Sequence, residues 1–263
     1  MTVGELLDAA LVLLRTRARV LLGVGLGLAA VEQAVLFVLR RAAHLGQSYI
    51  PRDGYVFEWL LVVVTGFAAE TAIITVLGGL AAAAALPALL GRPVPRPRRP
   101  GLPVAAVVAT VALVAGLACG LGALAVLPWL LCYLLFGLAA PVAVVDRTGP
   151  GRALLRSAAL VARSGFRPGF IRLFGYLGWL FFRLALSLGT LAVLDLVPAD
   201  TDAWRTLAPV LAWLVVNALA YPVLGCLDAV LHLEARMRAE GLDIALTRAL
   251  QRNESIERAL AVP

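Results

Sequence analysis

Residues 146–175, DRTGPGRALLRSAALVARSGFRPGFIRLFG, form a basic segment between two long apolar stretches. The Gly-Pro pair at its start and the Gly and Pro residues near its middle are typical of helix boundaries, so a helix is predicted over 149–165. At 100° per residue, three of its arginines fall within about 40° of one another. These are Arg152, Arg156 and Arg163. The segment therefore predicts a basic amphipathic helix on a protein whose flanking sequence is apolar.

The composition explains those flanks. Of the 263 residues, 62% are hydrophobic and 15% are charged, with a mean hydropathy of +0.93. Soluble domains have about half apolar and about a quarter charged residues, so a bilayer must solvate the excess. We expect an all-α, polytopic integral membrane helix bundle, a single membrane domain over 1–263. All 23 basic residues are Arg, which, together with abundant Ala, Leu, Val and Gly, indicates a bacterial, GC-rich genome.

Apolar stretches predict six membrane spans: 20–39, 59–90, 104–123, 128–145, 170–197 and 207–233. The second exceeds the roughly 20 residues that a span needs. It is either one tilted helix or a helix broken near Gly78 or Pro87. An interfacial amphipathic helix is expected over 1–19, beginning at a capping box of Thr2 and Glu5.

Two pairs of glycines lie four residues apart within the spans. Gly23 and Gly27 are in the first span, and Gly116 and Gly120 are in the third. Small residues at this spacing let a second helix approach closely. Both pairs therefore predict tight helix contacts.

The arginines gather at one end of the spans. Eighteen lie near residue 17, in the proline-rich loop 91–101, in 146–175 and in a charged tail over 234–263. The opposite end has four: Arg40, Arg41, Arg52 and Arg205. The positive-inside rule then places both termini in the cytoplasm, with the protein in the cytoplasmic membrane. The net charge of +7 belongs to this inner surface, and we expect no nucleic-acid partner.

Several polar groups fall inside the predicted spans, where charges are costly and are paired or functional. They form a candidate intramembrane cluster: Glu32, Glu70, Arg183, Asn217 and Asp228. Glu70 and Arg183 both lie near mid-membrane, which predicts a buried ion pair. Glu32, nearer the outer face, is a second candidate partner. Asp228 lies nearer the inner surface, where it would snorkel or meet Arg236 or Arg238. Such a cluster either fixes the helix packing or lines a polar cavity or proton path.

The arginines of the inner end form a second candidate site, for lipids or a partner. It comprises Arg152, Arg156, Arg163, Arg236 and Arg238. Three roles stay open for 149–165: ordinary loop charge, binding of anionic headgroups or phosphate ligands, and docking of a membrane or cytoplasmic protein. We expect this segment, the tail and the N-terminal helix to form a cytoplasmic collar around the spans.

Signatures of catalysis are lacking in the sequence. There are two histidines, His44 and His232, which the predicted topology places on opposite sides of the membrane. Cys119, Cys132 and Cys226 lie in apolar runs without metal-ligand spacing, and a packing role is expected. No nucleophile elbow, Walker loop or zinc-protease motif occurs. We therefore expect no catalytic residues, cofactor or metal, and no enzyme activity.

Three stretches resemble a known family: residues 2–23, 138–166 and 232–243. The last, HLEARMRAEGLD, is similar to a tail motif LYxDLRxRxEGxD, with Glu234 in place of the aspartate. The middle stretch resembles the pattern ALRRSWxLxRGxF through 153–166. The family is bacterial, largely actinobacterial, and its polytopic membrane proteins are named for the membrane domain of glycerophosphoryl diester phosphodiesterase. The proline-rich loop 91–101 departs from its pattern.

The resemblance implies a membrane protein without the soluble phosphodiesterase domain, assisting a separately encoded enzyme or transporter. Together with the missing catalytic motifs, it favours a non-catalytic scaffold or accessory subunit. The alternative is a transporter or flippase-like protein with a polar intramembrane cavity around Glu70 and Arg183.

Overall fold

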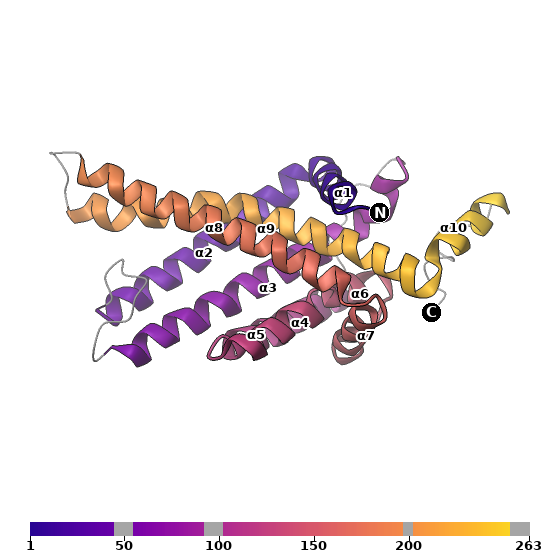
Figure 1. Ribbon diagram of the computed structural model, residues 1–263, viewed down its shortest axis with the longest axis horizontal. Helices are drawn as coiled ribbons and strands as arrows, with labels where there is room; N and C mark the ends of the chain where they lie inside the picture. Colours follow the sequence, from indigo (N-terminus) through magenta and orange to yellow (C-terminus); the bar gives the residue numbers. More distant parts are fainter. Residues whose placement is uncertain (45–54, 92–101, 197–201, 253–263) are drawn as a thin grey trace.

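The computed structural model describes residues 1–44, 55–91, 102–196 and 202–252, and within them the chain forms helices and no strands (Figure 1). The helices are α1 (Val3–Thr16), α2 (Ala18–Ala42), α3 (Val56–Leu89), α4 (Leu102–Gly122), α5 (Val126–Phe136), α6 (Ala139–Val145), α7 (Pro150–Arg163), α8 (Arg167–Asp195), α9 (Asp202–Glu240) and α10 (Leu242–Gln251). The prediction of an all-α fold is confirmed. Most of the proline-rich loop, at 92–101, and Arg52 lie outside the described residues.

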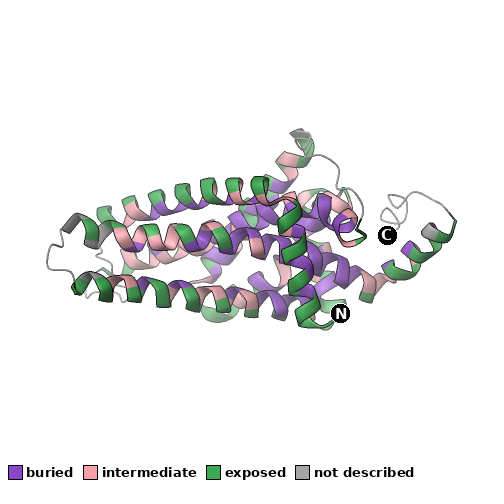
Figure 2. Cartoon of the chain, turned by 90° about the horizontal axis from the view of Figure 1, so that it is seen from above, coloured by how far each residue is buried: buried purple, intermediate pink, exposed green. Residues whose placement is uncertain are grey.

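Six segments are long and apolar enough to cross a membrane, as predicted: Ala18–Ala42, Val56–Leu89, Pro103–Gly122, Val126–Val145, Arg167–Val193 and Leu207–Glu240. Their outer surfaces carry exposed large apolar side chains, among them Val31, Phe57, Phe174 and Val215. Figure 2 shows exposed positions alternating with buried and intermediate ones along the long helices. A surface of this kind fits lipid as its solvent. The fold thus defines a helical, multi-pass membrane protein.

Helix α3 lies at the centre of the bundle and packs against α2, α4 and α9. It is continuous through Gly78 and Pro87, so the alternative of a broken second span is wrong. Gly78 serves helix packing, because an added Cβ at Gly225 of α9 would lie 2.8 Å from the Gly78 nitrogen. Two backbones approach this closely only where side chains are absent.

The fourth predicted span is divided, because α5 ends at Phe136 and α6 begins at Ala139. Pro141 gives the reason: it has no N–H for the carbonyl four residues earlier, at Gly137, and its ring crowds that carbonyl. Nearby acceptors are satisfied by side chains. Arg172 Nη1 donates to the Tyr133 carbonyl at 2.6 Å, and Ser157 Oγ donates to the Leu135 carbonyl at 2.5 Å.

The two glycine pairs have different outcomes. Added Cβ atoms at Gly116 and Gly120 would lie 2.7 Å from the carbonyl oxygens of Ala68 and Val64 on α3, so this close approach is confirmed. The prediction for Gly23 and Gly27 is wrong, since nothing lies within 4 Å of an added Cβ at either. The contact on α2 is made instead by Gly25, which faces Pro222 of α9.

One end of the bundle collects the short helices. Figure 1 shows α1, α6, α7 and α10 at the same end, together with the N-terminus. The predicted capping box opens α1: Thr2 N donates to Glu5 Oε2 at 2.8 Å, and Glu5 N donates to Thr2 Oγ1 at 3.3 Å. The expected boundary between the last span and the tail, at residue 234, is displaced, because α9 continues unbroken to Glu240.

Candidate functional site

The polar cluster within the helix bundle is centred on Arg183, a buried side chain of α8. Its Nη1 donates to Glu70 Oε1 on α3 and, at 3.1 Å, to Asn217 Oδ1 on α9. The guanidinium also lies 5.4 Å from the ring centre of Tyr176 and 5.2 Å from that of Trp213, which stabilises it as a cation. The ion pair predicted between Glu70 and Arg183 is therefore present.

Glu32 extends this cluster to α2. Asn217 Nδ2 donates to its Oε2 at 3.2 Å, and Tyr221 Oη lies 2.8 Å from Oε2 and 2.9 Å from Oε1. Tyr176 Oη donates to Glu70. The cluster thus holds two carboxylates and one guanidinium, and Glu32 is bonded only to neutral partners in the described structure. One uncompensated negative charge remains if both carboxylates are ionised, and burying such a charge is costly.

The aromatic members of the cluster were not predicted, although the spacing of polar residues along α8 and α9 indicates them. Arg172, Tyr176 and Arg183 lie four and seven residues apart on α8, which places them on one face. Asn217, Tyr221 and Asp228 repeat the same spacing on α9. The two polar faces meet because α8 packs against α9.

Asp228 has a different partner from the one expected. Its Oδ1 accepts from Arg172 Nε at 2.8 Å, and both side chains are buried, so the predicted contacts with Arg236 or Arg238 are wrong. Arg172, which the sequence count assigned to the inner loop, lies one turn into the span that begins at Arg167. Its guanidinium carbon is 3.7 Å from the ring centre of Tyr133. A buried carboxylate is stabilised by a cation that is buried beside it, because an unpaired buried charge is costly.

Aromatic rings join the two buried ion pairs. Tyr133 and Tyr176 have ring centres 5.0 Å apart, and Trp129 stacks on Tyr133 at 5.6 Å. The Tyr133 hydroxyl, Asp228 Oδ2 and Arg172 Nη2 are buried without a hydrogen-bond partner among the described residues. Buried polar atoms of this kind are uncommon and call for an explanation.

A second ionic network closes the end of the bundle. Asp146, between α6 and α7, accepts from Arg156 Nε at 2.6 Å and from Arg236 Nη1 at 3.0 Å. Glu240 lies within 2.8 Å of both arginines. His232 Nε2 is 3.9 Å from Asp146. The network ties α7 to the end of α9.

The electrostatics of Asp146 follow from these neighbours. Its partial burial on its own would raise the pKa of the carboxyl. His232, Arg236 and Arg156 outweigh that effect and hold the pKa of Asp146 below its ordinary value of 3.8. Asp146 therefore stabilises the network as a carboxylate.

The network changes the predicted arginine site. Arg236 is only 2% exposed and Arg156 is half-buried against Asp146 and Glu240. These two therefore do not present the open basic surface that the sequence predicts. Arg238 pairs with Glu234, which also binds Arg167. The Arg238 side chain is nevertheless 46% exposed. Asp146 and the carboxylates of α9 hold Arg156 and Arg236 away from solvent through charge-assisted hydrogen bonds.

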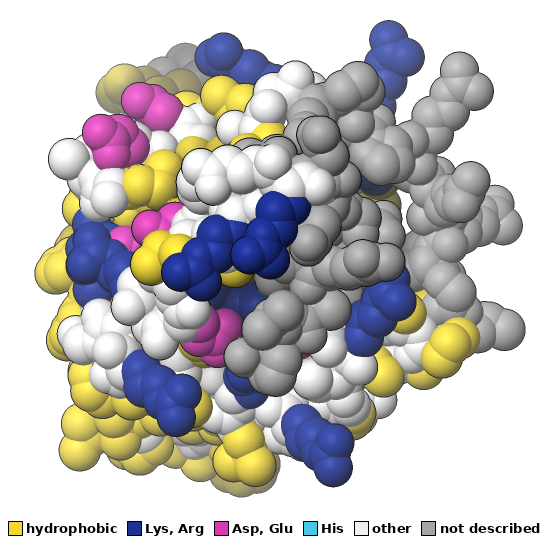
Figure 3. Space-filling model, turned by 90° about the vertical axis from the view of Figure 1, so that its right-hand side faces the viewer, with side chains coloured by type: hydrophobic (Ala, Val, Ile, Leu, Met, Phe, Trp, Pro, Cys, Tyr) yellow, Lys and Arg dark blue, Asp and Glu magenta, His cyan; other side chains and the backbone are white. Residues whose placement is uncertain are grey.

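Arg152 and Arg163 remain exposed on α7, whose opposite face buries Ala153, Ser157, Leu160 and Val161. Figure 3 views this end of the bundle and shows arginine side chains spread across it, with acidic groups between them. The surface is thus mixed in sign and carries several accessible guanidinium groups.

No group of three or more His, Cys, Asp or Glu side chains suited to a metal ion occurs in the described part of the chain. Cys119 and Cys226 are buried and Cys132 is half-buried, all as free thiols.

The site thus consists of two buried ion pairs and an ionic network at one end of a multi-pass helical bundle. Comparisons with protein-family models, with curated proteins and with solved structures find no match for the chain.

Proposed function

We propose that the protein is a non-catalytic scaffold or accessory subunit of a bacterial cytoplasmic membrane. The observation that carries this proposal is the polar network of Glu32, Glu70, Arg183 and Asn217, which joins α2, α3, α8 and α9 through direct contacts. Charged groups that satisfy one another inside a bundle fix the rotation of each helix and favour one packed arrangement.

The end of the bundle with α7 is proposed to face the cytoplasm, with both termini there, since the arginines of the chain gather at that end. Exposed Arg152 and Arg163 would contact anionic headgroups or a membrane or cytoplasmic protein. Helices α1 and α7 would lie at the interface as parts of the collar. The family resemblance adds that such a partner is a separately encoded enzyme or transporter.

A proton-linked transporter or flippase-like protein is the second candidate, favoured by Glu32. This buried carboxylate has only neutral hydrogen-bond partners, so one proton on it would neutralise the cluster. Further titratable groups, Asp228 and His232, follow along α9 toward Asp146. A line of such groups is typical of proton relays.

Reconstitution into liposomes separates the candidates. Purified protein is tested for proton flux under a pH gradient and for transfer of labelled phospholipid between leaflets. The scaffold predicts rates equal to those of protein-free liposomes for wild type and for Glu32→Gln alike. Proton flux that disappears in Glu32→Gln would establish the transporter.

Partner contact is tested in native membranes with a photo-crosslinking residue at Arg163 or Arg152. The matched control carries it at Val31, whose side chain is exposed on α2. The scaffold predicts a discrete protein adduct from α7 that the control lacks. Adducts with lipid alone at both α7 positions would contradict it.

A further inference from the structure

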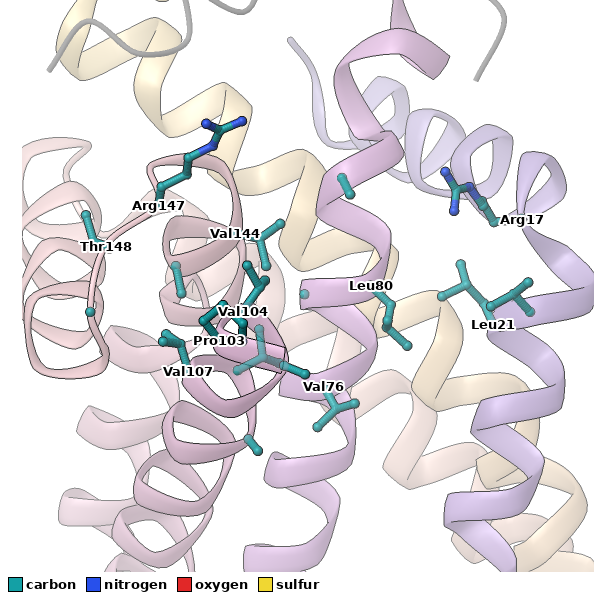
Figure 4. Close-up of a pocket in the computed structure, with 18 residues that line it drawn as sticks. Arg17, Leu21, Val76, Leu80, Pro103, Val104, Val107, Val144, Arg147 and Thr148 are labelled. Atoms are coloured by element: carbon teal, nitrogen blue, oxygen red, sulfur yellow. The ribbon is translucent and has the colours of Figure 1, made fainter. Parts of the chain in front are cut away.

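A pocket of about 760 Å³ opens between the start of α2, the second half of α3, the first turns of α4 and the α6–α7 connection. Its wall is mainly apolar and includes Leu21, Val76, Leu80, Val104 and Val107 (Figure 4). The volume is within the roughly 300–1,000 Å³ of typical ligand pockets. It lies apart from the buried ion pairs, because none of their residues lines it.

Two arginines lie at one end of this pocket. Figure 4 shows Arg147 and Arg17 on opposite sides of the apolar wall, both toward the same end. Arg147 is exposed and forms no ion pair with any residue that the structure describes. Its φ of 51° is in the left-handed region, which a non-glycine residue adopts only where its surroundings impose it. The pocket therefore combines a positive end with an apolar interior.

Thr148, next to Arg147, adds a polar group to the same wall. Its hydroxyl oxygen is buried and has no hydrogen-bond partner in the described parts of the chain. A buried hydroxyl normally finds a partner, since leaving it unpaired costs free energy. Thr148 therefore adds one buried, unsatisfied polar atom beside Arg147.

We propose that this pocket binds one anionic glycerophospholipid from the surrounding leaflet. The phosphate lies at the end of the pocket that Arg17 and Arg147 flank, and an acyl chain lies along Leu80, Val76 and Val107. Charge complementarity selects the headgroup, because guanidinium groups bind phosphate strongly. The apolar wall selects a lipid over a free phosphate compound, which has no apolar surface to bury there.

The test uses the purified full-length chain, stripped of lipid in detergent and titrated with phosphatidylglycerol or with phosphatidylcholine of the same acyl chains. Native mass spectrometry counts the lipids retained. We expect one phosphatidylglycerol to be retained at concentrations at which phosphatidylcholine is not. The double variant Arg17→Gln/Arg147→Gln should weaken phosphatidylglycerol binding by roughly tenfold or more, since each arginine near a phosphate contributes several-fold.

A second variant tests the apolar part without touching charge. Ala109 lines the pocket and is exposed, so Ala109→Phe fills it without displacing the core, and binding should be lost. Ala106→Phe, at an exposed residue of α4 outside the lining, is its control. Arg248→Gln/Arg252→Gln, at two exposed arginines outside the lining, is the control for the charge variant and should bind like wild type.

Three results would overturn the proposal. They are equal retention of the two lipids, unchanged binding in both pocket variants, and an equal loss in the pocket variants and their controls. Binding of free glycerol phosphate as tightly as the lipid would assign the arginines to a soluble ligand instead. Each protein is checked for a single monodisperse species, and Ala109→Phe decides the outcome if the charge variant does not fold.

Discussion

Arg183 of α8 is bonded to Glu70 of α3, although 113 residues separate them in the chain. Asn217 accepts from the same guanidinium and donates to Glu32, so one arginine connects four helices. The two carboxylates differ in kind, because Glu70 contacts the cation directly and Glu32 contacts neutral groups.

That difference predicts unequal effects of the same substitution. Glu70→Gln leaves Arg183 as an unpaired buried cation and should lower the free energy of unfolding by about 3–5 kcal/mol. Glu32→Gln keeps the shape of the side chain and removes no ionic contact, so it should cost less than about 1 kcal/mol. Thermal unfolding in detergent measures both. Equal losses in the two variants would contradict the assignment of Glu70 as the partner of Arg183.

The Arg172–Asp228 pair predicts strong coupling between two substitutions. Arg172→Met leaves Asp228 and the Tyr133 carbonyl without their donor, and Asp228→Asn leaves Arg172 without its counter-charge. Each should cost about 3 kcal/mol, and the double variant should lose at least about 1 kcal/mol less than the sum. A double-mutant cycle on thermal stability checks this. Simple additivity would show that the two groups do not interact.

Asp146 predicts a dependence of stability on pH. Its pKa is lower in the folded protein than its ordinary 3.8, so its contribution is complete above that value and is lost as pH falls through the folded pKa. Wild type should therefore be more stable than Asp146→Asn above pH 3.8, with the gap closing at lower pH. The melting temperatures of both proteins are measured across pH 3 to 7. The difference between them at each pH removes the contribution of the other acidic groups, which both proteins share. A gap that widens toward low pH would contradict the sign.

The glycine contacts predict which substitutions the bundle tolerates. Gly120→Ala places a methyl group 2.7 Å from both the Val64 carbonyl and the Ala68 Cβ on α3, and should cost about 1–3 kcal/mol by overpacking. Gly23→Ala meets nothing within 4 Å and serves as the control, with no loss expected. Thermal stability in detergent compares them. Equal tolerance at both sites would mean that α4 does not approach α3 this closely.

Topology is tested by labelling from outside the cell. The proposed orientation predicts that a membrane-impermeant maleimide reacts with Tyr55→Cys, near the start of α3, and not with Arg163→Cys at the end of α7. Both positions are exposed in the fold. Unsubstituted protein is the background control, since its own thiols lie within the spans. Labelling of Arg163→Cys alone would reverse the orientation.

The sequence by itself determined the helical class, the six spans, the capping box at Thr2 and the pairing of Glu70 with Arg183. Hydropathy and capping act within one helix, and an isolated buried charge demands the opposite one at the same depth. Only the tertiary structure decided that Asp228 binds Arg172, that Arg236 turns inward to Asp146, and that Arg17 and Arg147 share a pocket. These contacts depend on which neighbour each helix face meets, and the periodicity of a single helix does not contain that information.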